Sequence, residues 1–490
     1  MRLALDREGS SPLYQQIENY FRAGILSGSL AAETRLPATR QLARDLGVNR
    51  MTVESAYSHL EADGLVFFRL GSGTYVLGAP SLAKPVGGAE ALPLPAWQRA
   101  IQAGELMQSS QYAGEELNIA SGPDVIHFAG GTGDPDLSPV AEFRKVVQTV
   151  MRRDGISALE YGEPRGYAPL RATIAQVLTS QGIQALPENV LISSGSQQAI
   201  ALVAQLLLRE GQAVLVESPT YGGALDLFRQ LRLQVLSVPV DEQGMQVDGL
   251  EALFEVVRPG LIYTMPDFHN PTGVCLSGQR RQRLMELANR YEIPILEDDY
   301  VGDLRYEGHA QPALKALDTR GQVIYTSTFS KMLMPGLRIG FLVANGPVFE
   351  ALARSKRAND LATSNLMQRS LEAYVTVGRY QAHLRKSCHL YKSRRDTLLQ
   401  ACRRYLPADV QFTVPRGGLF LWLRLPEQME AVALLPLACK AGVDFVPGSG
   451  FFPNPADGVH FLRLNFAMLQ REQISAGIQR LGKVIEHSRT

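Results

Sequence analysis

The chain has 490 residues, 45% of them hydrophobic and 20% charged, an ordinary globular composition for about three domains. Its formal net charge of +1 excludes a global electrostatic field that would draw it to nucleic acid or to a membrane. The four cysteines form no CxxC pair and no spacing that predicts a metal site, which suits a reducing compartment. The N-terminal MRLALDREGS lacks the apolar core of a signal peptide, and the most apolar run, 199–208, is too short to span a membrane, so we expect a cytoplasmic protein.

Residues 1–78 are predicted to form a separate small domain. Ser11 is expected to cap a first helix, whose apolar stripe runs from Leu13 to Ile25. A second helix is predicted to end at Gly47, and Asn49 to cap a third. The runs LVFFRL and TYVL around a GSG turn predict a hairpin, and three helices followed by a hairpin is the order of a winged helix-turn-helix.

Three stretches of this region resemble the DNA-binding domain of the GntR family: PLYQQIENYFRAGILSGSL, RLPATRQLARDLGVNRMTVESAYSHLEADGLV and GSGTYV. Residues 35–50 hold four arginines against Asp45 alone, although the eight arginines and eight acidic residues of 1–78 cancel. The start of the third helix, the turn region and the hairpin tip are predicted to contact double-stranded DNA through Arg40, Asn49, Arg50, Thr52, Arg69, Gly71 and Ser72. A small protein-interaction domain is the alternative.

Residues 79–120 are predicted to be a linker and lead-in segment, rich in Ala, Pro and Gly at first, with Trp97 expected to dock on the protein. Residues 121–490 alternate apolar strand-like runs with helical patterns, which predicts an α/β domain with a mostly parallel central sheet. GGLFLWLRL and FLRLNFA indicate a smaller C-terminal α+β subdomain.

One lysine, Lys331, stands among Thr328, Ser330 and Arg338 in the stretch STFSKMLMPGLRIG. An amine among hydroxyls and a guanidinium suits an aldehyde cofactor that carries a phosphate, such as pyridoxal 5'-phosphate, which binds lysine as a Schiff base. The sequence therefore predicts Lys331 as the residue that carries the cofactor.

The other atoms of this cofactor predict further residues. Asp298, at a strand end, suits the ring nitrogen, and Tyr300 and Asn270 suit the phenolic oxygen. SSGSQQ, between a strand and a helix, predicts a phosphate site at Gly195, Ser196 and Gln197. Tyr221 suits the ring face, and Arg463 suits a substrate carboxylate. Each signal has an ordinary alternative: a solvated loop acid, a simple cap and turn, or a structural tyrosine or arginine.

HNPTG and the stretch from Thr328 to Gly340 closely resemble the fold-type I aminotransferases that use pyridoxal phosphate, over about residues 121–488. The resemblance implies the roles above for Lys331, Asp298, Asn270 and Arg463, with Arg338 and Ser196 on the phosphate. Tyr161 matches a tyrosine that reaches the phosphate from the other subunit, which implies a homodimer. In many enzymes of this class a tyrosine stands three residues after the aspartate, whereas here Tyr300 comes after two.

A GntR-type head on an aminotransferase-like body resembles the MocR/GabR group of bacterial transcription regulators. The resemblance implies a pyridoxal-phosphate-dependent regulator that binds promoter DNA and senses an amino acid or amine. Two alternatives stay open. One is a working aminotransferase with an accessory head, and the other is a scaffold that senses pyridoxal phosphate itself.

Overall fold

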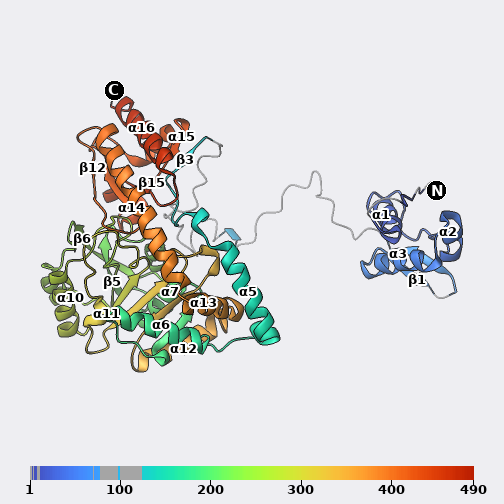
Figure 1. Cartoon of the computed structure of the whole chain (residues 1–490), viewed down its shortest axis with the longest axis horizontal. Coiled ribbons are helices and arrows are strands. Elements are labelled where there is room, and N and C mark those ends of the chain that lie inside the picture. The colour runs from blue at the N-terminus through green and yellow to red at the C-terminus, as the bar shows by residue number, and fades with distance from the viewer. Residues whose placement is uncertain are drawn as a thin grey trace. The chain divides into compact units, whose positions relative to one another are not determined.

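The computed structural model describes these residues: 3, 5–7, 11–69, 71–77, 98–99 and 124–489. The chain divides into two compact units, residues 1–102 and 103–490, and each is described by itself (Figure 1). Except for 98–99, the linker predicted at 79–120 lies outside the described residues, and so does the predicted docking of Trp97.

The N-terminal unit, called the head below, contains three helices and a hairpin in the predicted order. Its elements are α1 (Leu13–Leu26), α2 (Thr39–Leu46), α3 (Arg50–Ala62), β1 (Val66–Arg69) and β2 (Gly73–Val76). α1 and α2 both pack against α3, and the apolar stripe of α1 is buried in their shared core. The hairpin pairs Val66 with Val76 and Arg69 with Gly73, and residues 34–36 add hydrogen bonds to β2.

Two of the three predicted helix caps are present in the structure, and the third is not. Gly47 ends α2 in the left-handed conformation, at φ 63°, and Asn49 Oδ1 accepts a hydrogen bond of 3.0 Å from the amide of Met51 at the start of α3. The prediction that Ser11 caps α1 is wrong. Pro12 occupies the N-cap with extended ψ of 143°, so the serine lies one residue too early and makes no cap hydrogen bond.

The larger unit, called the body below, is built on a mostly parallel sheet, as predicted. Among residues 124–489 the strand order is β4-β11-β10-β9-β8-β5-β6-β7, with β11 and β7 antiparallel to their neighbours. The strands are β4 (Val190–Ser193), β5 (Ala213–Ser218), β6 (Gln234–Asp241), β7 (Gly244–Met245), β8 (Leu261–Thr264), β9 (Ile295–Asp299), β10 (Val323–Thr328) and β11 (Gly340–Val343). β4, β8 and β10 are buried along their whole length, as expected for a sheet covered on both faces.

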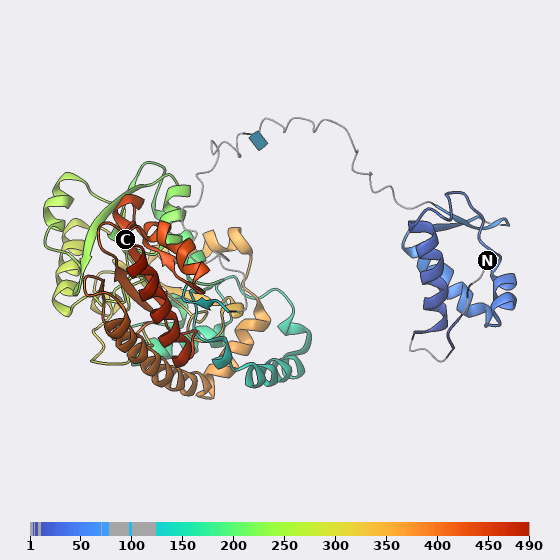
Figure 2. The ribbon, with the colours of Figure 1, turned by 90° about the horizontal axis from the view of Figure 1, so that it is seen from above.

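Helices surround this sheet (Figures 1 and 2). α7 packs against β4, β9, β10 and β11. α13 packs against α5, α6 and α14. The helices of this part are α5 (Val140–Asp154), α6 (Ala168–Ser180), α7 (Ser196–Leu207), α8 (Gly222–Gln230), α9 (Leu250–Val256), α10 (Gly278–Tyr291), α11 (Leu314–Leu317), α12 (Pro347–Asp360) and α13 (Asn365–Thr376). Short 3-10 turns are η1 (Pro135–Leu137), η2 (Gly155–Ala158), η3 (Pro187–Asn189), η4 (Pro335–Leu337), η5 (Gly448–Phe451) and η6 (Pro455–Gly458).

The C-terminal part forms the smaller α+β subdomain that the sequence predicts. The long helix α14 follows α13 in the chain and packs against both α13 and α16, the last helix of the small subdomain (Figure 1). A sheet of order β12-β13-β16-β15 lies here, and β14 pairs in parallel with β3. The elements are β3 (Ile126–His127), α14 (Arg379–Tyr405), β12 (Gln411–Phe412), β13 (Phe420–Arg424), α15 (Ala431–Lys440), β14 (Val443–Asp444), β15 (Val446–Pro447), β16 (Phe461–Asn465) and α16 (Arg471–His487).

No helix in the described part of the chain is long and apolar enough to cross a membrane.

Candidate functional site

The predicted cofactor residues follow strands that end at one edge of the central sheet. β8, β9 and β10 are parallel neighbours, and β4 runs the same way as β10 because both are antiparallel to β11. The loops after β4 and β10 and the end of β9 therefore meet at the edge where α/β sheets bind ligands. This edge carries Ser196, Asp298 and Lys331, which lie more than thirty residues apart in the sequence.

Asp298 is almost fully buried, at 2% exposed, near the end of β9. Tyr263, on the neighbouring strand β8, donates a hydrogen bond of 2.8 Å to Asp298 Oδ2. Oδ1 is buried and has no hydrogen-bond partner among the described residues. Burial raises the pKa of Asp298 to about 7, although the Tyr263 hydrogen bond opposes the rise. An orphaned buried carboxylate oxygen needs a donor, and the protonated ring nitrogen of pyridoxal phosphate fits that need.

The loop that carries Lys331 is held by its own hydroxyl groups. Thr328 Oγ1 donates to the carbonyl of Ile339 at 3.2 Å and accepts from the amide of Ser330 at 3.1 Å. The two hydroxyl residues are buried, while Lys331 is half-buried. These hydrogen bonds hold the backbone of the loop from which the Lys331 side chain extends.

Arg338 and two glycines form a compact cradle beside the N-terminus of α7. Arg338 donates to the carbonyl of Ser194 at 2.9 Å and to Ser330 Oγ at 3.4 Å. A Cβ atom on Gly195 would lie 2.7 Å from Arg338 Nη2, and one on Gly340 would lie 2.8 Å from Gly195 Cα. The glycines thus bring a guanidinium, a hydroxyl and the first amides of a helix together, a set of donors that fits a phosphate group.

The side chains of Gln197 and Tyr221 both lie against the first turn of α8. Gln197 Nε2 donates to the carbonyl of Gly223 at 2.9 Å, and a Cβ on Gly223 would meet the Tyr221 hydroxyl oxygen at 2.6 Å. The predicted phosphate role of Gln197 rests on its backbone amide, and the predicted ring contact of Tyr221 stays a prediction.

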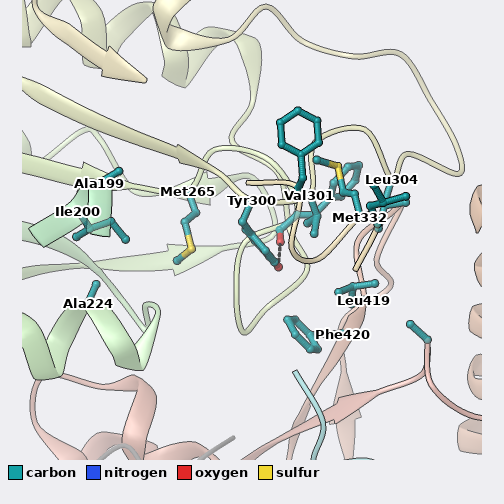
Figure 3. Close-up of a cluster of buried hydrophobic side chains, with 14 of the residues drawn as sticks. Ala199, Ile200, Ala224, Met265, Tyr300, Val301, Leu304, Met332, Leu419 and Phe420 are labelled. Carbon is teal, nitrogen blue, oxygen red and sulfur yellow. Dashed lines mark hydrogen bonds between the residues drawn. The ribbon is translucent and has the colours of Figure 1, made fainter. Parts of the chain in front are cut away.

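Tyr300 and Asn270 each make one defined hydrogen bond. The Tyr300 hydroxyl donates to the carbonyl of Phe268 at 2.8 Å, as the dashed line in Figure 3 shows, so that it can only accept a bond from elsewhere. Asn270 Oδ1 accepts from Arg463 Nη1 at 3.0 Å, and the NH2 group of the same amide is a donor. A donor suits a phenolate oxygen, so Asn270 meets the predicted requirement more directly than Tyr300 does.

Arg463 is fully buried on β16 and lies close to two aromatic rings. Its guanidinium carbon is 4.0 Å from the ring centre of Phe420 and 5.0 Å from that of Phe451. Nε is buried without a hydrogen-bond partner among the described residues. A buried arginine with an unused donor is arranged to receive an anion such as a carboxylate.

Tyr161 lies on the chain surface, at 87% exposed, between η2 and α6. Ile156 and Leu159, a few residues earlier, are also exposed, at 70% and 58%. A tyrosine that completes the site of a second copy must be accessible on its own chain, so this placement is compatible with the predicted role.

Sequence reasoning missed the residues that surround Asp298. Tyr263 was part of an apolar run, LIYTM, that indicated only a buried strand. Glu217, also buried, accepts from Thr264 Oγ1 and the Met265 amide at 2.9 Å each and raises the pKa of Asp298 by charge repulsion. The sequence does contain one indication of these contacts. Tyr263 and Thr264 lie within a fully buried strand, and buried hydroxyl groups need hydrogen-bond partners.

In the head, the predicted DNA residues occupy exposed or half-exposed positions. Arg40 is exposed on α2, and Arg50, the first residue of α3, donates through Nε to Glu54 Oε1 at 2.6 Å. Asn49 uses its Oδ1 as the cap of α3, and Thr52 is half-buried.

The predicted wing residues lie at the hairpin. The Arg69 guanidinium carbon is 5.7 Å from the ring centre of Tyr75. Gly71 has φ 73°, which the turn requires, and the hydroxyls of Ser72 and Tyr75 are 2.6 Å apart. The DNA contacts themselves stay predictions.

Two family models match the chain. "Bacterial regulatory proteins, gntR family" matches residues 13–76, and "Aminotransferase class I and II" matches residues 124–481. The chain is 30% identical to the HTH-type transcriptional regulator YdfD of Bacillus subtilis, over 97% of this chain and 96% of YdfD. It is 32% identical to the probable rhizopine catabolism regulatory protein MocR of Rhizobium meliloti, over 92% and 90%. The structure of LysN, an alpha-aminoadipate aminotransferase of Thermus thermophilus complexed with N-(5'-phosphopyridoxyl)-L-leucine, is 35% identical with a TM-score of 0.74, over 80% of this chain and 99% of that one.

Proposed function

The chain belongs to the GntR family of bacterial regulators, in the MocR-type form that carries an aminotransferase class I and II domain, and from this premise we propose how it works. The head binds promoter DNA, and the body senses an amino acid or amine through its cofactor. The observation that carries the proposal is the orphaned Asp298 Oδ1, at the same sheet edge as Lys331 and the Arg338 cradle, in a chain that also has a DNA-binding head. A DNA-binding regulator acts where the DNA is, which supports a cytoplasmic location.

The cofactor is pyridoxal 5'-phosphate, which when bound supplies an electrophilic carbon and an electron sink. Lys331 holds its aldehyde, Asp298 accepts from its ring nitrogen, and Asn270 donates to its phenolic oxygen. Arg338, Ser330 and the first amides of α7 would hold its phosphate. The role of Asp298 agrees with its Oδ1, which is buried and has no hydrogen-bond partner among the described residues.

The effector is an amine, and Arg463 favours one with a carboxylate. The guanidinium is buried, close to Phe420 and Phe451, and already bonded to Asn270, so a carboxylate bound here lies next to the cofactor. LysN, the solved relative, binds a phosphopyridoxyl amino acid, which supports an amino acid as the effector class. A scaffold that senses pyridoxal phosphate itself, without an amine, is a separate alternative.

The body forms a homodimer. Tyr161 is 87% exposed and is proposed to reach the phosphate of the partner subunit, and the exposed apolar Ile156 and Leu159 lie beside it in sequence. A second copy of this chain is the occupant that covers these side chains and completes both cofactor sites.

Catalytic transamination is the second candidate, because the residues that would hold the cofactor and a substrate carboxylate are present. Lys331, Asp298, Asn270 and Arg463 all occupy positions that suit a working site, and LysN is itself an aminotransferase. The regulator has the stronger support, because YdfD and MocR resemble the chain over more than nine tenths of its length, head included.

One preparation of full-length protein distinguishes the two. Loaded with pyridoxal phosphate, it is tested for binding to the promoter fragment upstream of its own gene, and for ketoacid release from each of the common amino acids. The proposal expects specific promoter binding with ketoacid release that is slow or absent. Rapid turnover without specific promoter binding would establish the enzyme instead.

A further inference from the structure

The first turn of α3 carries an exposed apolar side chain. Met51 is 65% exposed and directly follows Arg50. Single exposed apolar residues are common on proteins and by themselves indicate nothing. What distinguishes Met51 is its position, because the N-terminal residues of the second helix in a helix-turn-helix contact base edges in the major groove.

The side chains next to Met51 in the sequence make contacts within the head. Asn49 uses its side-chain oxygen to cap the helix at 3.0 Å, and Val53 is fully buried in the core. Arg50 has its Nε bonded to Glu54 at 2.6 Å, which leaves its two terminal nitrogens as donors. The outward surface of this turn therefore includes a charged guanidinium next to a thioether, with the exposed Asn49 and the half-buried Thr52 beside them.

A thioether is a weak acceptor and gives no useful donor, so it cannot read the hydrogen-bonding pattern of a base pair. The major groove presents one apolar feature, the 5-methyl group of thymine. We infer that Met51 contacts a thymine methyl group and thereby specifies a thymine in each half-site of the operator. This inference rests on the proposed binding of promoter DNA.

The test replaces single thymines by deoxyuridine, which removes only the methyl group and keeps base pairing. A footprint on the promoter fragment upstream of the gene first locates the half-sites, and each thymine within them is then replaced in turn. Affinity of the full-length protein is measured by fluorescence anisotropy at fixed salt, because phosphate contacts make affinity depend on salt. Burial of one methyl group is worth roughly fourfold in affinity.

Three variants accompany the wild type. Met51→Ala removes the apolar contact, Met51→Leu retains it, and Leu26→Ala removes another exposed apolar side chain of the head, at the end of α1. We expect one thymine in each half-site at which deoxyuridine weakens wild-type and Met51→Leu binding by about fourfold. Met51→Ala should bind thymine and deoxyuridine equally at that position, and Leu26→Ala should behave as the wild type.

Two results would overturn the inference while the proposed function stands: specific binding with no thymine sensitive to deoxyuridine, or the same sensitivity retained in Met51→Ala. Failure of the wild type to bind the fragment specifically would overturn the proposed function and this inference with it. Because Met51 is exposed, loss of its side chain removes no core contact, and circular dichroism of Met51→Ala confirms that the head is folded.

Discussion

A single hydrogen bond, from Tyr263, holds the buried carboxylate of Asp298. The bond has two effects. It occupies Oδ2 and leaves the buried Oδ1 without a partner among the described residues, and it lowers the pKa of a carboxyl group that burial raises to about 7. Without it, Asp298 would be more fully protonated near neutral pH and would attract a positively charged ring nitrogen less.

Tyr263→Phe should therefore weaken the binding of pyridoxal phosphate by about 10- to 150-fold, since hydrogen bonds to charged groups contribute roughly 1.5–3 kcal/mol. Binding is followed by cofactor absorbance across a pH series, and the variant's affinity should fall further as pH decreases. Tyr325→Phe is the control, because Tyr325 donates in the same way to the next acid of β9, Asp299 Oδ2, at 2.7 Å in a part-buried pair. If both variants lose the same affinity, the effect is structural and Tyr263 has no specific role.

At the scale of elements, β9 carries three consecutive acids, of which Glu297 and Asp298 are buried and Asp299 is half-buried. Burial raises the pKa of Glu297 and Asp298 to about 7 and that of Asp299 to about 8. A carboxyl group whose folded pKa lies above its unfolded value, about 4, favours the folded state fully below pH 4. That contribution is lost as pH rises through the folded pKa, so this strand makes the body less stable toward alkaline pH.

We expect the free energy of unfolding of the cofactor-free protein to fall between pH 5.5 and pH 8.5. Asp299→Asn should reduce that fall by up to about 3 kcal/mol, because it removes the group with the highest of the three pKa values. Denaturant unfolding at both pH values measures the difference. A variant with the same pH dependence as the wild type would show that Asp299 does not bind a proton in this range.

The glycines around the phosphate cradle make a second prediction at this scale. Gly340→Ala would place a Cβ within 3 Å of the Gly195 backbone, which should cost about 1–3 kcal/mol of stability and displace the start of α7. Gly336→Ala, in the same loop, meets nothing within 4 Å and should be nearly neutral. Equal cofactor affinity in the two variants, measured by titration, would contradict the assignment of the cradle to phosphate.

Sequence patterns predicted elements better than they predicted side-chain partners. Spacing alone placed the three helices and the hairpin of the head, because each helix has its own apolar stripe and its own end signals. The edge of the sheet that carries the site could be predicted from the ends of the parallel strands, and Asp298 and Lys331 both lie at this edge. Tyr263 could not be predicted, because its role depends on which strand neighbours β9 and on a hydroxyl that approaches Asp298 within 2.8 Å. The aromatic rings around Arg463 were missed for the same reason, since they come from β13 and η5.

At the scale of the whole molecule, the proposed dimer depends on exposed apolar side chains near Tyr161. Ile156→Asp should shift the protein to monomers and lower cofactor affinity, because each site would lose the tyrosine of its partner subunit. Val256→Asp, at a still more exposed apolar position on α9, is the control. Sedimentation at micromolar concentration measures the mass. A wild-type monomer with full cofactor occupancy would refute the shared site.

The central claim is that chemistry in the body changes the affinity of the head for DNA. A ligand shifts this equilibrium only by its differential affinity for the two states of the protein, a coupling of about 1–3 kcal/mol in typical allosteric proteins. The most direct measurement is the promoter affinity of full-length protein in three states: without cofactor, with pyridoxal phosphate, and with pyridoxal phosphate plus each common amino acid in turn. We predict that at least one amino acid changes the affinity by roughly 5–150-fold and that Lys331→Ala abolishes the change. Identical affinities in all states would contradict the account.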